Sequence, residues 1–213
     1  MGHVTTLRVP RQSTAAGVSL PNGRRSDYPI LPLFLERRSS RAFADDMISP
    51  LELATILEAA RWAPSSFNEQ PWRFIVARRG TTPWLRFSAW LTESNREWAV
   101  QAPILILLVA KNTRSVRAPH SFDTGAAWAH LALQAAASGL VAHAVAGFDH
   151  RRAEQELGIP YGFHAECLVA VGRPGSSEQL PQRLQTREAA SQRRALQEIA
   201  FDGEWEKPLE IQS

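Results

Sequence analysis

The sequence predicts a mixed fold, α+β or α/β, in which one central sheet carries helices on its faces. Three observations predict it. Apolar, strand-like runs alternate with helical patterns along the chain. The run Pro103–Ala110 is apolar throughout, as expected of a strand that is buried on both faces. The Ala-rich stretch Asp123–Ser138 has the composition of a long, well-buried helix, and 213 residues suffice for one domain with a substantial core.

The chain begins with a stretch that carries no clear element. Residues 1–28 mix Thr, Arg, Gly, Pro and Ser without periodicity, which predicts a flexible N-terminal extension. Residues 29–213 are expected to form a single domain that ends in a C-terminal extension, and a short helix is expected over Leu31–Arg38. No run resembles a membrane span or a signal peptide, so no membrane partner is expected, and the single cysteine, which allows no intrachain disulfide, fits a cytoplasmic location.

The next helix has the clearest boundaries. Ser49 can cap it, Pro50 suits its first position, Glu52 completes a capping box, and Pro64 ends it. Apolar runs predict strands at Trp72–Arg78, Ile104–Ala110, His143–Ala146 and Ala165–Gly172. Further helices are expected over about Pro83–Val100, over Asp123–Ser138, where Gly139 ends the helix, and from the capping residue Asp149 through Leu157. A helical or extended piece is expected over about Ser191–Ala200.

Several function classes find no support in the sequence. It contains no Gly-x-Gly-x-x-Gly motif after a strand, no Walker-type loop and no Gly-x-Ser-x-Gly elbow. The six histidines form no metal-ligand pair, so neither a metal site nor a triad hydrolase is expected. The lone cysteine, Cys167, lies in an apolar stretch and is interpreted as a buried strand thiol. A net charge of +3 with small, scattered arginine clusters and no reading motif predicts no nucleic-acid partner.

One basic, hydroxyl-rich segment, Arg37–Phe43, reads Arg-Arg-Ser-Ser-Arg-Ala-Phe. Three guanidinium groups and two hydroxyls within five residues suit a dianionic phosphate with a polyol, because arginine binds phosphate through two parallel hydrogen bonds. The alternative is a solvated basic helix end, and the segment by itself leaves both readings open.

A second segment, Ala63–Phe74, is a loop of small hydroxyls and amides followed by aromatic residues that enter a strand. Such a loop can offer backbone donors and side-chain amides to a flat, polar heteroaromatic ring. An ordinary helix-to-strand connection is the alternative. One capped helix separates the two segments, so both can flank its ends.

Together, the two segments resemble the opening of the nitroreductase family of flavoproteins. Further segments match the family in order: Asn95–Trp98 with Ala102 and Pro103; Asp123–Gly125 with Leu131–Leu140; Gly147–Asp149; Ile159 with Pro160; Val171–Pro174; and Arg193–Leu196 with Glu198 and Ile199. The resemblance covers about residues 30–175 and 191–206. It implies an α+β fold, a three-layer sandwich whose central, mostly antiparallel sheet is flanked by helices, in an intertwined homodimer.

The resemblance also implies the chemistry. The family binds FMN non-covalently in a cleft at the dimer interface and takes NAD(P)H as co-substrate. A small organic acceptor such as a nitroaromatic or a quinone then reacts at the same flavin, with ping-pong kinetics. No catalytic acid or base is assigned, because hydride transfer takes place at flavin N5 and the protein orients and tunes the cofactor. Two alternatives stay open: an FMN-dependent oxidase or dehydrogenase of a specialised metabolite, and a non-catalytic FMN-binding protein.

The family's phosphate and N1 contacts carry over to basic positions. The positions matched to the FMN phosphate and ribityl group are Arg37, Arg38, Ser39 and one of Arg193 and Arg194. Arg41 matches a basic position near the flavin N1 and C2 carbonyl. A cation there would stabilise the anionic reduced flavin and raise its potential.

Other positions match the contacts to the ring. Pro64, Ser65 and Ser66 match the segment that reaches the flavin from the partner subunit, with Asn68 and Gln70 close by. Asn95 matches an amide that pairs with the pyrimidine side. Gly147 matches a close backbone approach near N5, where a side chain would block the hydride route. The large aromatics Phe67, Trp98 and Trp128 either line the acceptor pocket or pack the dimer core.

Overall fold

The computed structural model describes residues 17–111 and 120–210. It divides the chain into two compact units: the two terminal segments, up to Glu36 and from Ala189, form one, and Arg37–Glu188 form the other. Residues 1–16, which make up most of the predicted flexible extension, lie outside the described residues. None of the helices in the two described ranges is long and apolar enough to span a membrane.

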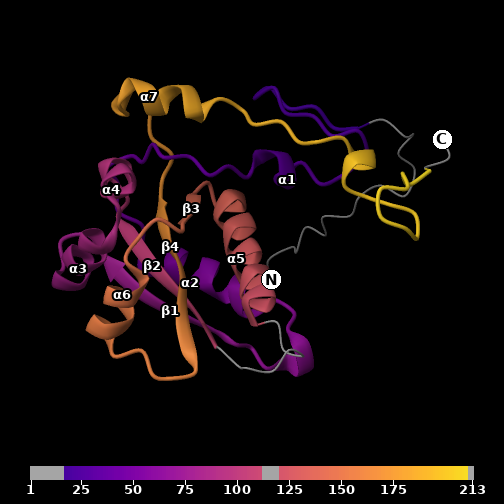
Figure 1. Cartoon of the computed structure of the whole chain (residues 1–213). Helices are drawn as coiled ribbons and strands as arrows, with labels where there is room; N and C mark the ends of the chain where they lie inside the picture. Colours follow the sequence, from indigo (N-terminus) through magenta and orange to yellow (C-terminus); the bar gives the residue numbers. More distant parts are fainter. Residues whose placement is uncertain (1–16, 112–119, 211–213) are drawn as a thin grey trace, which may run out of the picture. The chain divides into compact units, whose positions relative to one another are not determined.

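The larger unit is built on a sheet of four strands (Figure 1). They are β1 (Trp72–Arg78), β2 (Ile104–Lys111), β3 (Val141–Val145) and β4 (Phe163–Gly172), in the order β1-β2-β4-β3. Each neighbouring pair is antiparallel; Leu107 of β2, for example, lies opposite Ile75 of β1 and Leu168 of β4. The antiparallel pairing confirms the α+β class and rules out the α/β alternative.

Helices cover both faces of this sheet. Helices α3 (Thr82–Trp90), α4 (Glu93–Ala99) and α6 (His150–Leu157) pack on one face, and α2 (Pro50–Arg61) and α5 (His120–Ala137) pack on the other (Figure 1). Alternate residues of β2 enter the two cores because successive side chains of a strand point to opposite faces. Leu105, Leu107 and Val109 join the first core, and Ile104, Ile106 and Leu108 join the second. The predicted three-layer sandwich is confirmed.

The predicted start of α2 is also confirmed. The Ser49 hydroxyl accepts a hydrogen bond from the Glu52 amide at 3.2 Å, and the Glu52 carboxylate accepts one from the Ser49 amide at 2.8 Å. Pro50 occupies the first helical position, where its missing N–H costs nothing. At the other side of the sheet, Asp149 caps α6 as predicted, because its carboxylate accepts from the Arg152 amide at 3.0 Å.

The helical stretch expected over about Pro83–Val100 is interrupted. Leu91 has an extended conformation, φ −60° and ψ 139°, and separates α3 from α4. It forms an antiparallel bridge with Phe148, and the Thr92 amide donates to the Gly147 carbonyl at 3.0 Å. No glycine or proline marks the break in the sequence, because the cause is pairing with a distant segment.

The terminal unit contains little regular structure. Its helix α1 (Leu33–Glu36) is shorter at both ends than the helix expected over Leu31–Arg38. Beyond Glu36 the chain has no regular structure, and the Arg38 and Ser40 side chains bond to Glu188. Within Ser191–Ala200, only the 3-10 turn η4 (Leu196–Glu198) is helical. The chain between β4 and this unit holds three further short turns, η2 (Ser177–Gln179), α7 (Gln182–Gln185) and η3 (Thr186–Glu188).

Candidate functional site

The basic segment that begins at Arg37 lies outside any helix or long strand. An Arg37 guanidinium N–H donates to the Ser39 hydroxyl at 3.2 Å. In contrast, Arg38 donates to the main-chain carbonyl of Glu188, and the Ser40 hydroxyl donates to the Glu188 carboxylate at 2.5 Å. The structure therefore separates the predicted phosphate and ribityl residues: Arg37 and Ser39 lie together, and Arg38 turns to Glu188.

Glu188 is the residue that the sequence did not point to. Its side chain is only 8% exposed, and its carboxylate accepts from the Arg41 amide at 3.1 Å and from the Arg41 guanidinium at 3.4 Å. A glutamate in a polar stretch carries no signal of burial, since nothing in its local sequence shows that it will meet a segment about 150 positions away. This carboxylate holds the segment in place.

Two aromatic rings, those of Trp98 and His143, lie next to Arg41. Its guanidinium carbon lies 5.8 Å from the ring centroid of Trp98, and the ring of His143 lies 4.5 Å from the same indole. Trp98 is 2% exposed and packs in the core of the chain itself. Burial lowers the pKa of His143 to about 4, although a hydrogen bond to the Ser40 carbonyl opposes the shift. His143 is therefore neutral at neutral pH, with Nδ1 at 3.1 Å from the Ser40 carbonyl oxygen.

Asn95 and Gly147, which the resemblance matches separately to the flavin ring, lie in contact with each other. The Asn95 side-chain amide donates to the Gly147 carbonyl at 3.0 Å and to the Thr92 hydroxyl at 3.1 Å. A Cβ atom at position 147 would lie 2.4 Å from the same Asn95 nitrogen. The contact with Asn95 therefore requires glycine at this position, independently of any ligand.

The loop between α2 and β1 has an unusual backbone. Three of its residues have a positive φ: Phe67 (51°), Asn68 (55°) and Gln70 (49°). Residues other than glycine rarely adopt a positive φ unless other contacts hold the backbone in this conformation. Two contacts do so here, since the buried Asp123 carboxylate accepts from the Ser66 amide at 3.0 Å and the Ser65 hydroxyl accepts from the Gln70 amide at 3.0 Å. The loop is thus held in one shape and presents Phe67, which is 95% exposed.

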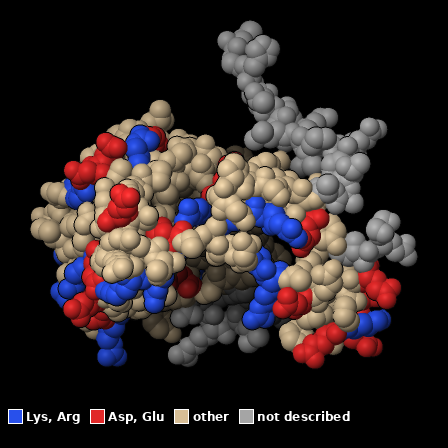
Figure 2. Space-filling view, turned by 90° about the horizontal axis from the view of Figure 1, so that it is seen from above, with Lys and Arg blue, Asp and Glu red and all other residues tan. Residues whose placement is uncertain are grey.

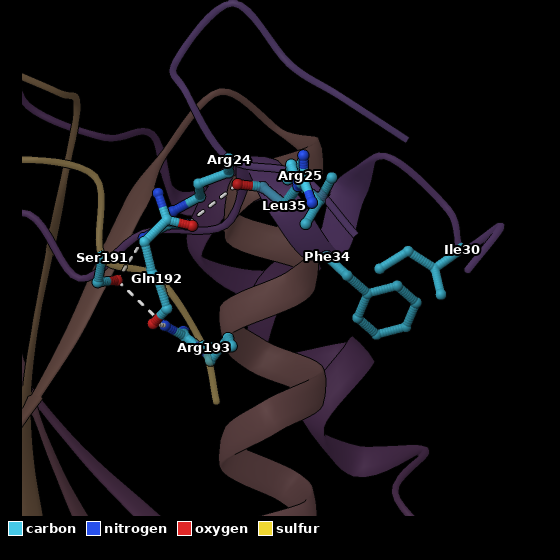
Figure 3. A pocket seen from close by; sticks show the side chains of 8 residues that line it. All are labelled: Arg24, Arg25, Ile30, Phe34, Leu35, Ser191, Gln192 and Arg193. Atoms are coloured by element: carbon cyan, nitrogen blue, oxygen red, sulfur yellow. Dashed lines mark hydrogen bonds between the residues drawn. The ribbon is translucent and has the colours of Figure 1, made fainter. Parts of the chain in front are cut away.

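The C-terminal arginines lie in the terminal unit. Arg193 lines a pocket of about 210 Å³ together with Arg24 and Ser191 (Figure 3). Arg24 is 8% exposed and donates to the Leu35 carbonyl and the Ser191 hydroxyl, both at 3.0 Å. The Arg193 guanidinium donates to the same hydroxyl at 3.1 Å. Arg193 and Arg194 both line a second pocket of this unit, so both predicted arginines border a concave surface.

Other chemistry finds little support. Within residues 17–111 and 120–210, no three His, Cys, Asp or Glu side chains gather as a metal ion would need. Burial raises the pKa of the Cys167 thiol to about 12, which agrees with a buried strand thiol and not with a nucleophile. Basic and acidic side chains both occur over the face shown in Figure 2.

Known proteins share this architecture. The model of a family described as Nitroreductase family matches residues 35–83, which include both the basic segment and the loop. A solved structure of an oxidoreductase containing FMN is 40% identical, has a TM-score of 0.83, and covers 88% of this chain and 98% of its own. An uncharacterized 15.4 kDa protein of Mycolicibacterium smegmatis is 33% identical over 64% of this chain and 99% of its own length. An NADH dehydrogenase of Thermus thermophilus is 29% identical over 66% of this chain and 84% of its own.

Proposed function

Because the chain belongs to the nitroreductase family, we propose that it is an FMN-dependent oxidoreductase that uses NAD(P)H to reduce a small organic acceptor. The names of two relatives support the cofactor and the co-substrate: one contains FMN and one is an NADH dehydrogenase. The observation that carries the proposal furthest is that Arg37, Ser39 and Arg41 lie within one short segment, and that the carboxylate of Glu188 holds this segment through Ser40 and Arg41.

The donor chemistry of this segment fits FMN. A phosphate dianion requires cationic donors and a ribityl chain requires hydroxyls, and Arg37 and Ser39 offer both within hydrogen-bonding distance of each other. We assign the phosphate and ribityl contacts to this pair, together with one of Arg193 and Arg194. Arg38, which bonds to Glu188, would support the segment from behind.

The ring contacts are assigned to three parts of the chain. FMN, when bound, supplies the redox chemistry by accepting hydride from NAD(P)H and releasing it to the acceptor. Arg41 would place positive charge near the pyrimidine edge of the ring, and the Asn95 amide would face the same edge. Gly147 keeps the Asn95 amide in position and leaves the backbone accessible.

The second copy of the chain completes the proposed site. Helix α2 and the residue that follows it leave two large apolar side chains uncovered, Leu51 at 77% and Trp62 at 71% exposure. They line a pocket with Gln134 of α5, and the chain continues directly from this face into Pro64–Gln70. We propose that a second copy covers this face. The fixed loop, through Pro64, Ser65 and Ser66 with Asn68 and Gln70, would then reach the flavin of that copy.

Steady-state kinetics test this function. Oxidation of NADPH and of NADH is followed with p-benzoquinone or nitrobenzene as acceptor, and we expect turnover with parallel double-reciprocal lines at varied acceptor concentration. Protein that holds FMN but oxidises neither nucleotide would favour the two alternatives, an oxidase or dehydrogenase of a specialised metabolite or a non-catalytic FMN-binding protein. The cytoplasmic location stays a prediction.

A further inference from the structure

Glu188 is a buried carboxylate for which the proposed FMN contacts give no role. Its side chain is 8% exposed, and removal of a carboxylate from water is costly unless donors replace the water. Three donors do so: the Ser40 hydroxyl, the Arg41 amide and the Arg41 guanidinium. Its main-chain carbonyl takes a fourth, from Arg38. All four come from the segment that the proposed function assigns to the cofactor.

The contact with Glu188 uses only part of the hydrogen-bonding capacity of the Arg41 guanidinium. Glu188 meets one of its nitrogens at 3.4 Å, and a guanidinium offers five N–H donors in a planar fork. Among the residues that the structure describes, no other acceptor bonds to the Arg41 guanidinium, and Trp98 lies beside it at 5.8 Å. The side chain is therefore held from one edge by a carboxylate and flanked by an indole.

His143, the titratable side chain that packs on the same indole as Arg41, adds no charge beside Arg41 and Glu188 at neutral pH. Its burial lowers its pKa and keeps the ring neutral. The Glu188 carboxylate lies 3.4 Å from the Arg41 guanidinium, and opposite charges at this distance offset each other in the field that they produce beyond the pair.

We propose that Glu188 is a positioning residue of the flavin site, which fixes the direction of the Arg41 side chain and offsets part of its positive charge. The inference rests on the proposed function, because it assigns Arg41 to the flavin. Its consequence is specific: the carboxylate holds the reduction potential of the bound flavin below the value that Arg41 alone would give, since a reduced flavin carries negative charge and is stabilised by an uncompensated cation.

The variant Glu188→Gln keeps the size and the hydrogen-bond acceptor of the side chain but removes its charge. In FMN-loaded protein, equilibrium reduction against reference dyes should show a midpoint potential shifted to a more positive value than in the wild type. Glu178→Gln removes the same charge from an exposed position in η2 and should leave the potential unchanged. Equal potentials in wild type and Glu188→Gln would overturn the proposal, whereas a merely structural role would lower stability without a shift.

A second pair of variants keeps the test decisive where Glu188→Gln does not fold. Arg41→Gln removes the cation, and Arg41→Gln with Glu188→Gln replaces the ion pair by two neutral amides. The double variant should have a more positive potential than Arg41→Gln alone; identical potentials would contradict the proposal. Failure of the proposed function looks different, because wild-type protein would then hold no FMN and no potential would be measurable in any variant.

Discussion

The side-chain amide of Asn95 donates a hydrogen bond to the main-chain carbonyl of Gly147 across 3.0 Å. Asn95 follows Leu91 and Gly147 precedes Phe148, and the antiparallel bridge between Leu91 and Phe148 interrupts the helical stretch and gives α4 its own start. One contact thus connects the break between α3 and α4 with the loop after β3. It is the point at which the fold determines the geometry of the proposed site.

Gly147→Ala should disrupt this contact. The added Cβ would lie 2.4 Å from the Asn95 nitrogen, so the amide must move, and overpacking of this kind costs about 1–3 kcal/mol. Chemical denaturation should show this loss, and FMN titration should show weaker binding. Gly125→Ala is the matched control, because its Cβ has open space within α5 and a helical Gly→Ala change stabilises by about 0.5–1 kcal/mol. A Gly147→Ala variant with wild-type stability and affinity would contradict the account.

Arg41→Ala should weaken FMN retention and lower the reduction potential of the FMN that remains, because it removes the cation assigned to the pyrimidine edge. Dialysis against buffer measures retention, and dye-coupled reduction measures the potential. Arg86→Ala removes the same charge from an exposed position on α3 and should change neither value. An unchanged potential in the FMN-loaded Arg41→Ala protein would remove Arg41 from the electrostatics of the flavin.

Much of the fold was predictable because its signals are local. Strand β1 matches its prediction residue for residue, and the capping box at Ser49 and Glu52 fixes the start of α2. The break at Leu91 was not predictable, since it depends on pairing with Phe148 far along the chain. The contacts of the segment after α1 were also hidden, because Arg38 and Ser40 bond to Glu188 far along the chain.

The candidate site, too, was predictable from the sequence only in part. The motifs pointed to Asn95 and Gly147, and the structure places them in contact. They gave no sign of Glu188, whose importance comes from its position and not from its local sequence. The positive φ angles of the loop were also hidden, because Phe67 and Asn68 are not glycine and the fixed shape depends on the distant Asp123.

His143 should make stability depend on pH. The pKa of His143 falls from 6.5 to about 4 in the folded protein. Between these pH values the unfolded chain binds a proton that the folded chain does not, so the free energy of unfolding decreases as the pH falls from 6.5 towards 4. The gap corresponds to at most roughly 3 kcal/mol. Urea denaturation across this window should show a smaller decrease for His143→Gln than for the wild type, and equal decreases would exclude His143 as a source.

Leu51→Glu should weaken the proposed dimer. The substitution places a charge on the uncovered apolar face of α2, where a second copy would have to bury it at high cost. Sedimentation velocity should show a larger monomer fraction, and FMN should be lost with the dimer. Leu85→Glu is the matched control, since Leu85 is 62% exposed on α3, on the other face of the sheet. A monomer that binds FMN stoichiometrically would refute the shared site.

The visible absorption spectrum of the purified protein tests the central claim most directly. After incubation with FMN and removal of the excess, NADPH and then NADH are added without oxygen. The account predicts a flavin spectrum that travels with the protein and bleaches with at least one of the two nucleotides. A protein that carries no flavin after this treatment would contradict the enzyme assignment, although its membership of the fold family would stand.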